Sequence, residues 1–446
     1  MSEIPVLSAD ANFARRTFLA MTAASAAGLA VHGPVLAQPA QSKLPVTGTP
    51  NRSLEPFDKL MTSFLQENKV PGASLAITSN RRLVYARGFG YADVEKKESV
   101  QPAALFRIAS VSKPITAVAV MQLVAKDKLK LDDKVMDRMM LMPFLAEGAQ
   151  PDPRWNQITV RQCLQHTGGW DRSKSYDPIV RPQEIARTLG IQLPVEPEHV
   201  VRYMMGQPLD FNPGERHAYS NLGYLVLGRI IEAVTGQQYE AYVQQEVLGP
   251  LGVTAARLGL AQLANRTKDE VRYYDSKLRT GPCLFAPQIG QQVPLPYGAE
   301  NFEAYEAHGG WIASAVELVK FASALDDPAR CPILAAKAIE EMWSRPDGNA
   351  GAEPDGRPKA AFYGCGWNVR PIGTTGKSNT WHTGNIAGTE SLLVRRWDGL
   401  NWAVLFNTCF NPEGKLLAGL IDGRLHEAAG MVKVWPRSDQ FGRFLS

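Results

Sequence analysis

The segment FRIASVSKPITAVAVMQLVA, residues 106–125, decides the fold of this chain. From Ile115 to Ala125 nearly every side chain is apolar, and the segment lacks the polar face of a surface helix. A helix that is apolar all round is stable only when neighbouring elements cover it on every side, usually at the centre of a domain. We therefore predict that the rest of the chain packs around one buried helix, which begins just after Ser110.

Short segments of β-forming residues lie on both sides of this helix, far from it in the sequence. Residues 73–78 and 83–88 are joined by Ser79-Asn80-Arg81, a pattern typical of a β-hairpin. Asp398-Gly399 is a strong hairpin-turn pattern near the C-terminus. We predict an α/β (α+β) fold in which both chain ends build one antiparallel sheet, flanked by helices. The C-terminal strands are expected at residues 366–370, 378–383, 391–394 and 402–407, and the flanking helices at 55–68, 316–325 and 416–429.

The chain has 446 residues, which is enough for more than one lobe. Residues 50–125 and 301–446 carry the predicted strands, so we assign them to an α/β lobe. Residues 126–300 contain helical pieces broken by Pro- and Gly-rich loops, and we expect a mainly helical second lobe there. Residues 170–197 hold many prolines and charges with little periodicity, which predicts a surface loop or lid.

The N-terminal residues 1–37 have the pattern of a twin-arginine-type signal peptide. Arg15-Arg16 precedes an apolar, Ala-rich run from Ala20 to Val31, and small residues follow where cleavage would occur. The apolar run is shorter than the ~20 residues that a membrane-spanning helix needs. We expect a periplasmic or secreted protein, with no membrane span once the signal is removed.

Composition argues against several other classes of function. The net charge of +4 comes with no dense block of Lys or Arg, so we expect no nucleic-acid partner. The seven histidines form no HExxH pattern and the five cysteines no CxxC pair, so neither a metal nor another cofactor is expected. No G-x-S-x-G or Walker loop is present. Cys283 and Cys331 could form a disulfide, and the oligomeric state stays open.

The first chemical motif is Ser110-Val111-Ser112-Lys113, an SxxK pattern where the buried helix begins. Residues three apart share a helical face, so the Ser110 hydroxyl and the Lys113 amine can meet. A serine needs a neighbouring base to become a nucleophile, and burial lowers the pKa of a lysine towards neutrality. Alone the motif is weak, because it occurs about once or twice by chance in a chain this long. The alternative to a catalytic pair is that Ser110 simply caps the helix and Lys113 lies in solvent.

The second motif is Tyr219-Ser220-Asn221, which precedes a clear helix at residues 221–234. A tyrosine oxygen beside a lysine can act as a general base if the cation lowers the pKa of the phenol. The Asn221 amide offers a donor and an acceptor to a substrate ester or amide. A core tyrosine followed by an asparagine helix cap is the structural alternative.

The third motif is His382-Thr383-Gly384-Asn385, at the end of a predicted strand. Gly384 would allow a ligand to approach the backbone closely, and the Asn385 N–H with that of Ser110 could form an oxyanion hole. The triplet His166-Thr167-Gly168 repeats the pattern after a predicted helix at 159–165, where we interpret it as a C-terminal cap and turn.

SxxK, YxN and HTG in this order resemble the signature of the serine β-lactamase and penicillin-binding protein superfamily. The similarity runs from about Phe57 to the C-terminus and is greatest to the branch of class C β-lactamases, D-alanyl-D-alanine carboxypeptidases and family VIII-type carboxylesterases. It implies a β-lactamase-like fold and hydrolysis through an acyl-enzyme. Other segments carry the similarity as well: Phe106-Arg107-Ile108-Ala109, Phe211-Asn212-Pro213-Gly214, Gly309-Gly310-Trp311 and Tyr363-Gly364-Cys365-Gly366-Trp367.

The resemblance implies Ser110 as nucleophile, Lys113 and Tyr219 as proton-handling partners, and a substrate-binding set of Asn221, His382, Thr383, Gly384 and Asn385. His382 departs from class C β-lactamases, which carry lysine there as a fixed cation for a carboxylate. An imidazole is mostly neutral at pH 7, which disfavours β-lactams as the main substrates. We expect a small-molecule ester first, then a D-amino-acid peptide, then a lactam. A penicillin-binding sensor that acylates without turnover is the non-enzymatic alternative.

Replacing both Arg15 and Arg16 by lysine should block export, because the twin-arginine route reads that pair. The precursor should stay inside the cell, whereas the wild-type chain appears outside the inner membrane with its N-terminus near residue 38, as read by mass spectrometry. The adjacent pair Arg81-Arg82, changed to lysine in the same way, is the matched control. Equal export of both double variants would contradict the signal assignment.

Overall fold

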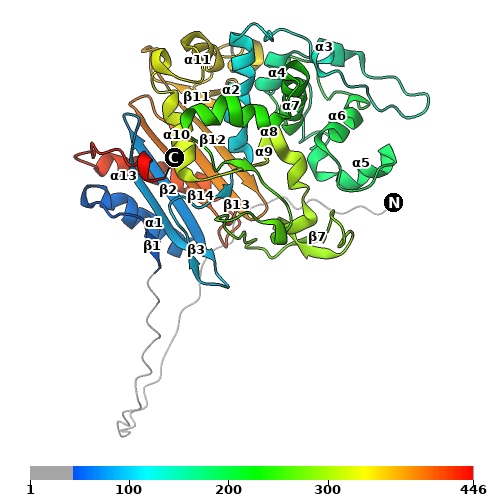
Figure 1. Cartoon of the computed structure of the whole chain (residues 1–446). Coiled ribbons are helices and arrows are strands. Elements are labelled where there is room, and N and C mark those ends of the chain that lie inside the picture. Colours follow the sequence, from blue (N-terminus) through cyan, green and yellow to red (C-terminus); the bar gives the residue numbers. More distant parts are fainter. Residues whose placement is uncertain (1–43, 445–446) are drawn as a thin grey trace, which may run out of the picture. The chain divides into compact units, whose positions relative to one another are not determined.

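Helix α2 (Ser112–Ala125) lies at the centre of the fold, where the sequence predicts it. A 3₁₀ turn at Ala109–Val111 leads into it, and every side chain from Ser112 to Leu123 is buried. The structure is a computed structural model that describes residues 44–444. Figure 1 shows α2 in cyan between the sheet and helices α4 (Val160–Leu164) and α7 (Asn221–Thr235). The predicted signal sequence, residues 1–37, lies outside the described residues.

The main sheet has nine strands and is antiparallel throughout. Its order is β1-β3-β2-β14-β13-β12-β11-β10, and β4 pairs with β3. The central pair joins the two ends of the chain, with Leu75 opposite Val404. The predicted sheet from both termini is therefore confirmed. The strands are β1 (Val46–Thr47), β2 (Gly72–Ser79), β3 (Arg82–Asp93), β4 (Glu98–Ser99), β10 (Phe362–Tyr363), β11 (Asn368–Pro371), β12 (Ser378–Ile386), β13 (Thr389–Arg395) and β14 (Leu400–Phe406).

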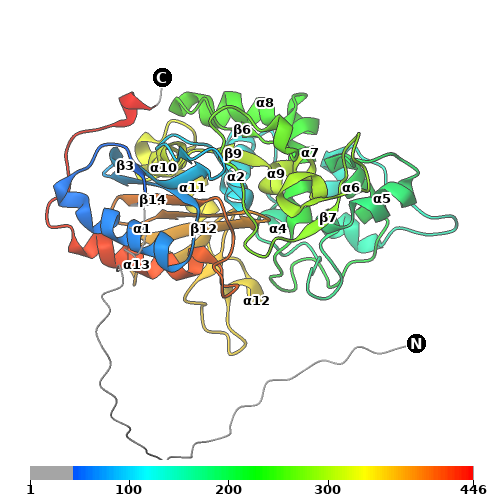
Figure 2. The same ribbon diagram turned by 90° about the horizontal axis from the view of Figure 1, so that it is seen from below.

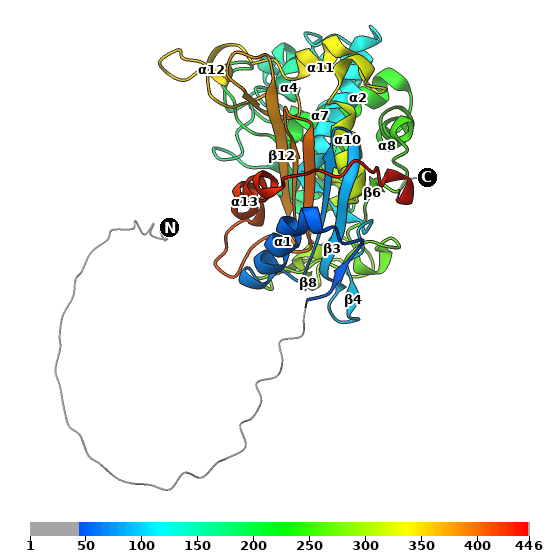
Figure 3. The same cartoon turned by 90° about the vertical axis from the view of Figure 1, so that its left-hand side faces the viewer.

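Helices cover both faces of this sheet. Helices α1 (Glu55–Glu67) and α13 (Leu417–Met431) lie side by side on one face, and α10 (Ala315–Ala324) lies on the other (Figures 2 and 3). Apolar side chains of α1 and α13 pack with those of β2 and β14 in one core. A larger core surrounds α2. These three helices match their predicted ranges to within two residues.

The middle of the chain is mainly helical. Its helices are α3 (Val135–Met139), α4, α5 (Pro182–Leu189), α6 (Pro197–Met205), α7 and α8 (Tyr239–Val243), and a small hairpin of β7 (Thr280–Pro282) and β8 (Gln292–Pro294) follows. The predicted loop at 170–197 contains α5, so its second half is not a plain loop. Its buried residues Pro182, Ile185 and Ala186 share one face, but a helix of eight residues is too short for this pattern to stand out among the surrounding prolines and charges. The exact division into two lobes stays a prediction.

Smaller elements connect these parts. Strand β9 (Trp311–Ala313) pairs with β5 (Phe106–Arg107) and with β6 (Arg257–Leu258), and α9 (Glu306–Gly309) precedes it. Two further helices, α11 (Ala336–Met342) and α12 (Gly348–Gly351), lie between α10 and β10. All five cysteines fall within the described residues and are free, so the possible Cys283–Cys331 disulfide is not formed. Within residues 44–444 we find no helix with the length and apolarity needed to cross a membrane.

Glu390 is a buried carboxyl that links the sheet to helix α13. It lies on β13, is 1% exposed, and accepts hydrogen bonds from the backbone N–H groups of Leu417 and Ala418 at the start of the helix. Burial raises the pKa of Glu390 to about 8. The folded protein therefore favours the protonated acid over a pH range in which the unfolded chain is ionised.

The Glu390→Gln variant should lose part of the pH dependence of stability. The pKa of Glu390 is about 8 in the fold and 4.5 in the unfolded chain, so the wild-type contribution is present below pH 4.5 and is lost as pH rises towards 8. The free energy of unfolding of the wild type should fall relative to the variant by up to ~1.4 kcal/mol per pH unit in this window. Urea unfolding at pH 5 and pH 8 measures the difference, and parallel pH curves would contradict the prediction.

Candidate active site

Ser110 lies in the turn that leads into α2, and its side chain meets that of Lys113. The Lys113 Nζ is 3.0 Å from the Ser110 Oγ. Ala109, directly before the serine, has a φ of +47°, a left-handed conformation that is costly for an L-residue and is common at functional sites. The structure thus places the nucleophile candidate on a sharp turn beside an amine.

The Lys113 side chain is fully buried and meets three oxygen atoms. Its Nζ lies 2.8 Å from the Asn221 Oδ1, 2.9 Å from the His308 carbonyl oxygen and 3.0 Å from the Ser110 Oγ. Burial holds the pKa of Lys113 well below its usual value. A neutral amine has two N–H groups and one lone pair. Two carbonyl oxygens can only accept, so they take the two hydrogens and leave the lone pair for the Ser110 hydroxyl.

Tyr219 contacts the same serine from the other side. Its hydroxyl lies 2.8 Å from the Ser110 Oγ, and its ring centroid is 4.8 Å from the Lys113 Nζ. The expectation that the lysine lowers the pKa of the phenol is wrong, because burial dominates and raises the pKa of Tyr219. Tyr219 is therefore a protonated phenol at neutral pH and can donate a proton.

His382 is neutral and is held by two hydrogen bonds. Its Nδ1 lies 2.6 Å from the Thr383 carbonyl oxygen, which can only accept, so the proton is on Nδ1. The Nε2, at 2.9 Å, then accepts from the Tyr363 hydroxyl. Burial lowers the pKa of His382 to about 3. No cation stands at this position across the physiological pH range.

Strand β12 passes directly beside Ser110 because Gly384 has no side chain. A Cβ at Gly384 would lie 2.2 Å from the Ile108 carbonyl oxygen and 2.9 Å from the Ser110 backbone nitrogen. The alternating residues Thr383 and Asn385 are exposed on the same strand. The glycine thus sets the distance between β12 and the serine.

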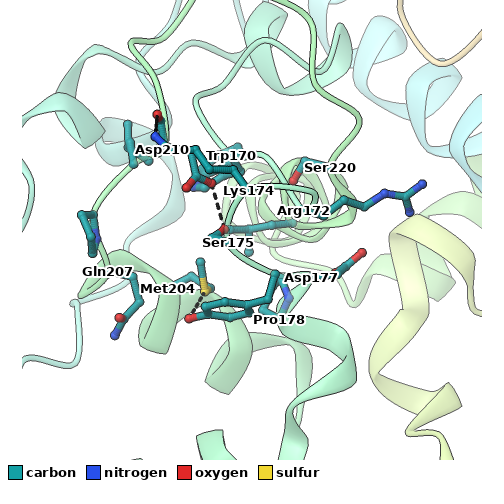
Figure 4. A pocket seen from close by; sticks show the side chains of 14 residues that line it. Trp170, Arg172, Lys174, Ser175, Asp177, Pro178, Met204, Gln207, Asp210 and Ser220 are labelled. Atoms are coloured by element: carbon teal, nitrogen blue, oxygen red, sulfur yellow. Dashed lines mark hydrogen bonds between the residues drawn. The ribbon is translucent and has the colours of Figure 1, made fainter. Parts of the chain in front are cut away.

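These side chains face a cleft of about 1020 Å³. Of the eight residues that the sequence singles out, Lys113 and Gly384 lie behind its wall, and the other six line it: Ser110, Tyr219, Asn221, His382, Thr383 and Asn385. A smaller pocket of about 300 Å³ lies next to it (Figure 4), and the two share Arg172, Ser175, Tyr176 and Asp177. Among residues 44–444 no cluster of His, Cys, Asp and Glu could hold a metal ion.

Sequence patterns did not identify two further groups at the site. The Asp177 Oδ2 accepts a hydrogen bond of 2.6 Å from the Asn221 Nδ2. His166 forms the expected turn after α4, but its ring also packs at 4.3 Å from that of Tyr219, and its Nδ1 accepts from the Ser220 N–H. Both contacts join residues more than 40 positions apart, so no local pattern could reveal them.

Comparison with known proteins adds a family and several relatives. A family model described as Beta-lactamase matches residues 57–423. The chain is similar to Protein flp of Staphylococcus aureus (strain N315), at 30% identity over 77% of this chain and 61% of that protein. It therefore spans less than two thirds of the length of these curated relatives. Esterase EstB of Burkholderia gladioli is 29% identical, over 82% of this chain and 93% of the esterase.

Solved structures agree with the fold. The octameric penicillin-binding protein homologue from Pyrococcus abyssi has a TM-score of 0.59 and 27% identity, over 82% of this chain and 76% of that chain. EstCE1, described as a hydrolase with promiscuous acyltransferase activity, has a TM-score of 0.64 and 24% identity, over 84% of this chain and 98% of that chain. The second likeness concerns the fold alone.

The Gly384→Ala variant should lose nucleophilic reactivity at Ser110, because a methyl group would push β12 away from the serine. A shift of about 1 Å at such a site costs on the order of 100-fold in rate. The measurement is the rate at which a fluorophosphonate reagent labels Ser110, read by mass spectrometry.

The matched control is Gly419→Ala in α13, where a Cβ would meet nothing within 4 Å. That variant should label at the wild-type rate and gain about 0.5–1 kcal/mol in stability, as alanine replaces glycine within a helix. Wild-type labelling of Gly384→Ala would show that β12 does not need to lie so close.

Proposed function

The chain belongs to the beta-lactamase family, and on that premise we propose that it is a serine hydrolase that forms an acyl-enzyme on Ser110. The observation that carries the proposal is the convergence of three side chains. The Ser110 Oγ lies 3.0 Å from the Lys113 Nζ and 2.8 Å from the Tyr219 hydroxyl. A buried amine with its lone pair facing a serine has the arrangement required of a general base.

In the proposed acylation step, the Ser110 oxygen attacks the substrate carbonyl carbon while its proton moves to the Lys113 Nζ. The Asn221 Oδ1 and the His308 carbonyl oxygen hold the ammonium that forms, since both accept hydrogen bonds from it. The low dielectric around the buried amine strengthens these bonds. Backbone N–H groups of Ser110 and Asn385 are proposed to stabilise the oxyanion.

Collapse of the tetrahedral intermediate needs a proton on the leaving group. Tyr219 is suited to donate it, because burial keeps its phenol protonated. The Lys113 ammonium then restores the proton to Tyr219, so that the net transfer runs from Ser110 to the leaving group. In deacylation, water attacks the acyl carbon and gives its proton to the same pair, and the Ser110 oxygen leaves with a proton.

A small ester is the proposed first choice of substrate, and the neutral His382 supports it. A carboxylate at that end of the cleft would find a neutral imidazole already bonded to Tyr363. A substrate without a carboxylate does not need a cation at this position. A D-amino-acid peptide or amide and a lactam are the alternatives, and a penicillin-binding sensor is the non-hydrolytic one. The names of similar proteins include an esterase and a D-amino acid amidase.

Purified protein should hydrolyse p-nitrophenyl butyrate with the highest kcat/KM of three substrates, ahead of a D-Ala-D-Ala peptide and nitrocefin. The expected order follows from the missing cation at His382. Ser110→Ala should abolish turnover of all three substrates, a loss on the order of 10⁴-fold or more. Initial rates over a substrate series measure both effects.

Ser112→Ala is the matched control, since Ser112 is two residues from Ser110 but is 0% exposed and does not line the cleft. Full activity of Ser110→Ala would refute the proposed function. A stable acyl-enzyme by mass spectrometry, with no turnover afterwards, would instead identify the sensor.

A further inference from the structure

Asp177 connects the loop over the cleft to the buried lysine through one amide. It follows Tyr176 in the loop and caps the short 3₁₀ helix Pro178–Val180. Its Oδ2 accepts a 2.6 Å hydrogen bond from the Asn221 Nδ2, and the Asn221 Oδ1 lies 2.8 Å from the Lys113 Nζ. In Figure 4 the Asp177 carboxyl points to the right, away from Gln207 and Met204 on the far side of the smaller pocket.

The carboxylate decides which way the Asn221 amide faces. An amide has one end that donates and one that accepts, whereas a carboxylate only accepts. The Asn221 Nδ2 must therefore face Asp177, and the Oδ1 must face the lysine. In the reversed orientation two acceptors would meet at Asp177, and an N–H would point at the Lys113 Nζ.

The orientation matters because Lys113 has only one lone pair when neutral. With the Oδ1 facing it, the amine donates one hydrogen to Asn221 and the other to the His308 carbonyl oxygen. Its lone pair then remains directed at the Ser110 hydroxyl. With the Nδ2 facing it, the lone pair would be occupied by Asn221, and a hydrogen would point at the serine instead. The Lys113 lone pair would then be unable to accept the proton of the Ser110 hydroxyl.

We propose that Asp177 is a positioning residue, which holds the Asn221 amide so that Lys113 presents its lone pair to Ser110. This inference rests on the proposed function, because it explains how the general base is kept ready. Asp177 acts through Asn221 and exchanges no proton with the substrate. The loop that carries Asp177 also forms the wall shared by the cleft and the smaller pocket. The orientation of the Lys113 amine therefore depends on the position of that loop.

The charge of Asp177 has a second effect, on the protonation of Lys113. Asp177 favours the ammonium and Arg172 disfavours it, both weakly compared with burial. Burial raises the pKa of Asp177 itself, although the hydrogen bond from Asn221 and the charge of Arg172 oppose this. Above that pKa the carboxylate is charged, and its removal leaves Lys113 deprotonated down to a lower pH. The other titratable groups around the amine are held neutral by burial: Tyr219, Tyr224, His166, His308 and His382.

Two variants separate the hydrogen bond from the charge. Asp177→Ala removes both, and its plateau kcat on p-nitrophenyl butyrate should fall about 10- to 100-fold with little change in KM. Asp177→Asn keeps an oxygen that can accept from Asn221, so its plateau kcat should stay within about threefold of wild type. In both variants the acid limb of kcat/KM should move to lower pH. A merely structural role would not produce a common pH shift with different plateaus.

Asp171→Ala is the matched control, because Asp171 braces the same loop through Ser173 and Arg216 without contacting Asn221. Its plateau kcat and pH profile should equal those of the wild type, and thermal unfolding confirms that each variant is folded. A wild-type kcat for Asp177→Ala, an unmoved acid limb in both Asp177 variants, or an equal loss in Asp171→Ala overturns the inference.

Ser110→Ala, assayed in parallel, distinguishes a failure of the positioning role from a failure of the proposed function. If it is inactive while Asp177→Ala is unaffected, the positioning role alone is wrong. If Ser110→Ala retains turnover, the proposed function fails and the role of Asp177 fails with it.

Discussion

The burial of one amine beside one hydroxyl is the constraint on which the rest of this structure depends. Lys113 is 0% exposed, and a charged ammonium there would carry a large desolvation cost. Burial lowers the pKa of Lys113 well below its usual value, which favours the neutral amine, and two carbonyl oxygens, of Asn221 and His308, accept its hydrogens. Since these oxygens come from α7 and α9, the helices around α2 contribute to the proposed chemistry as well as to the packing.

The main sheet brings strand β12 close to the turn that carries Ser110. Strand β12 comes from the C-terminal part of the chain, yet Gly384 lies against the backbone of Ile108 and Ser110. Pairing of β14 with β2 brings the two chain ends into one sheet, and β13 links that pair to β12. The position of β12 beside the serine thus follows from the whole sheet, and any side chain larger than hydrogen at residue 384 would oppose it.

Neutral groups dominate this site. The ring nitrogens of His382 are hydrogen-bonded to the Tyr363 hydroxyl and the Thr383 carbonyl oxygen. Tyr219 keeps its proton because burial outweighs the hydrogen bond to Ser110 and the charge of Arg172. Together with the neutral Lys113, these residues form a network in which each donor faces an acceptor and no fixed charge contacts the serine. For the proposed hydrolase, such a site would favour a substrate that is uncharged near the reacting carbonyl, and Asp177 and Arg172 supply charge at the edge of the network.

Sequence alone determined the buried helix 115–125, the spacing that brings Ser110 to Lys113, and the strands that join the chain ends, because each depends on residues that are neighbours in a helix or strand. Tertiary structure decided the rest. The protonation of Tyr219, the orientation of the Asn221 amide and the contacts of Asp177 and His166 depend on burial and on partners distant in the chain. The periodicity of a sequence shows which face of a helix or strand is apolar. It does not show which residues pack against that face, and those neighbouring residues set the pKa values and the directions of the hydrogen bonds.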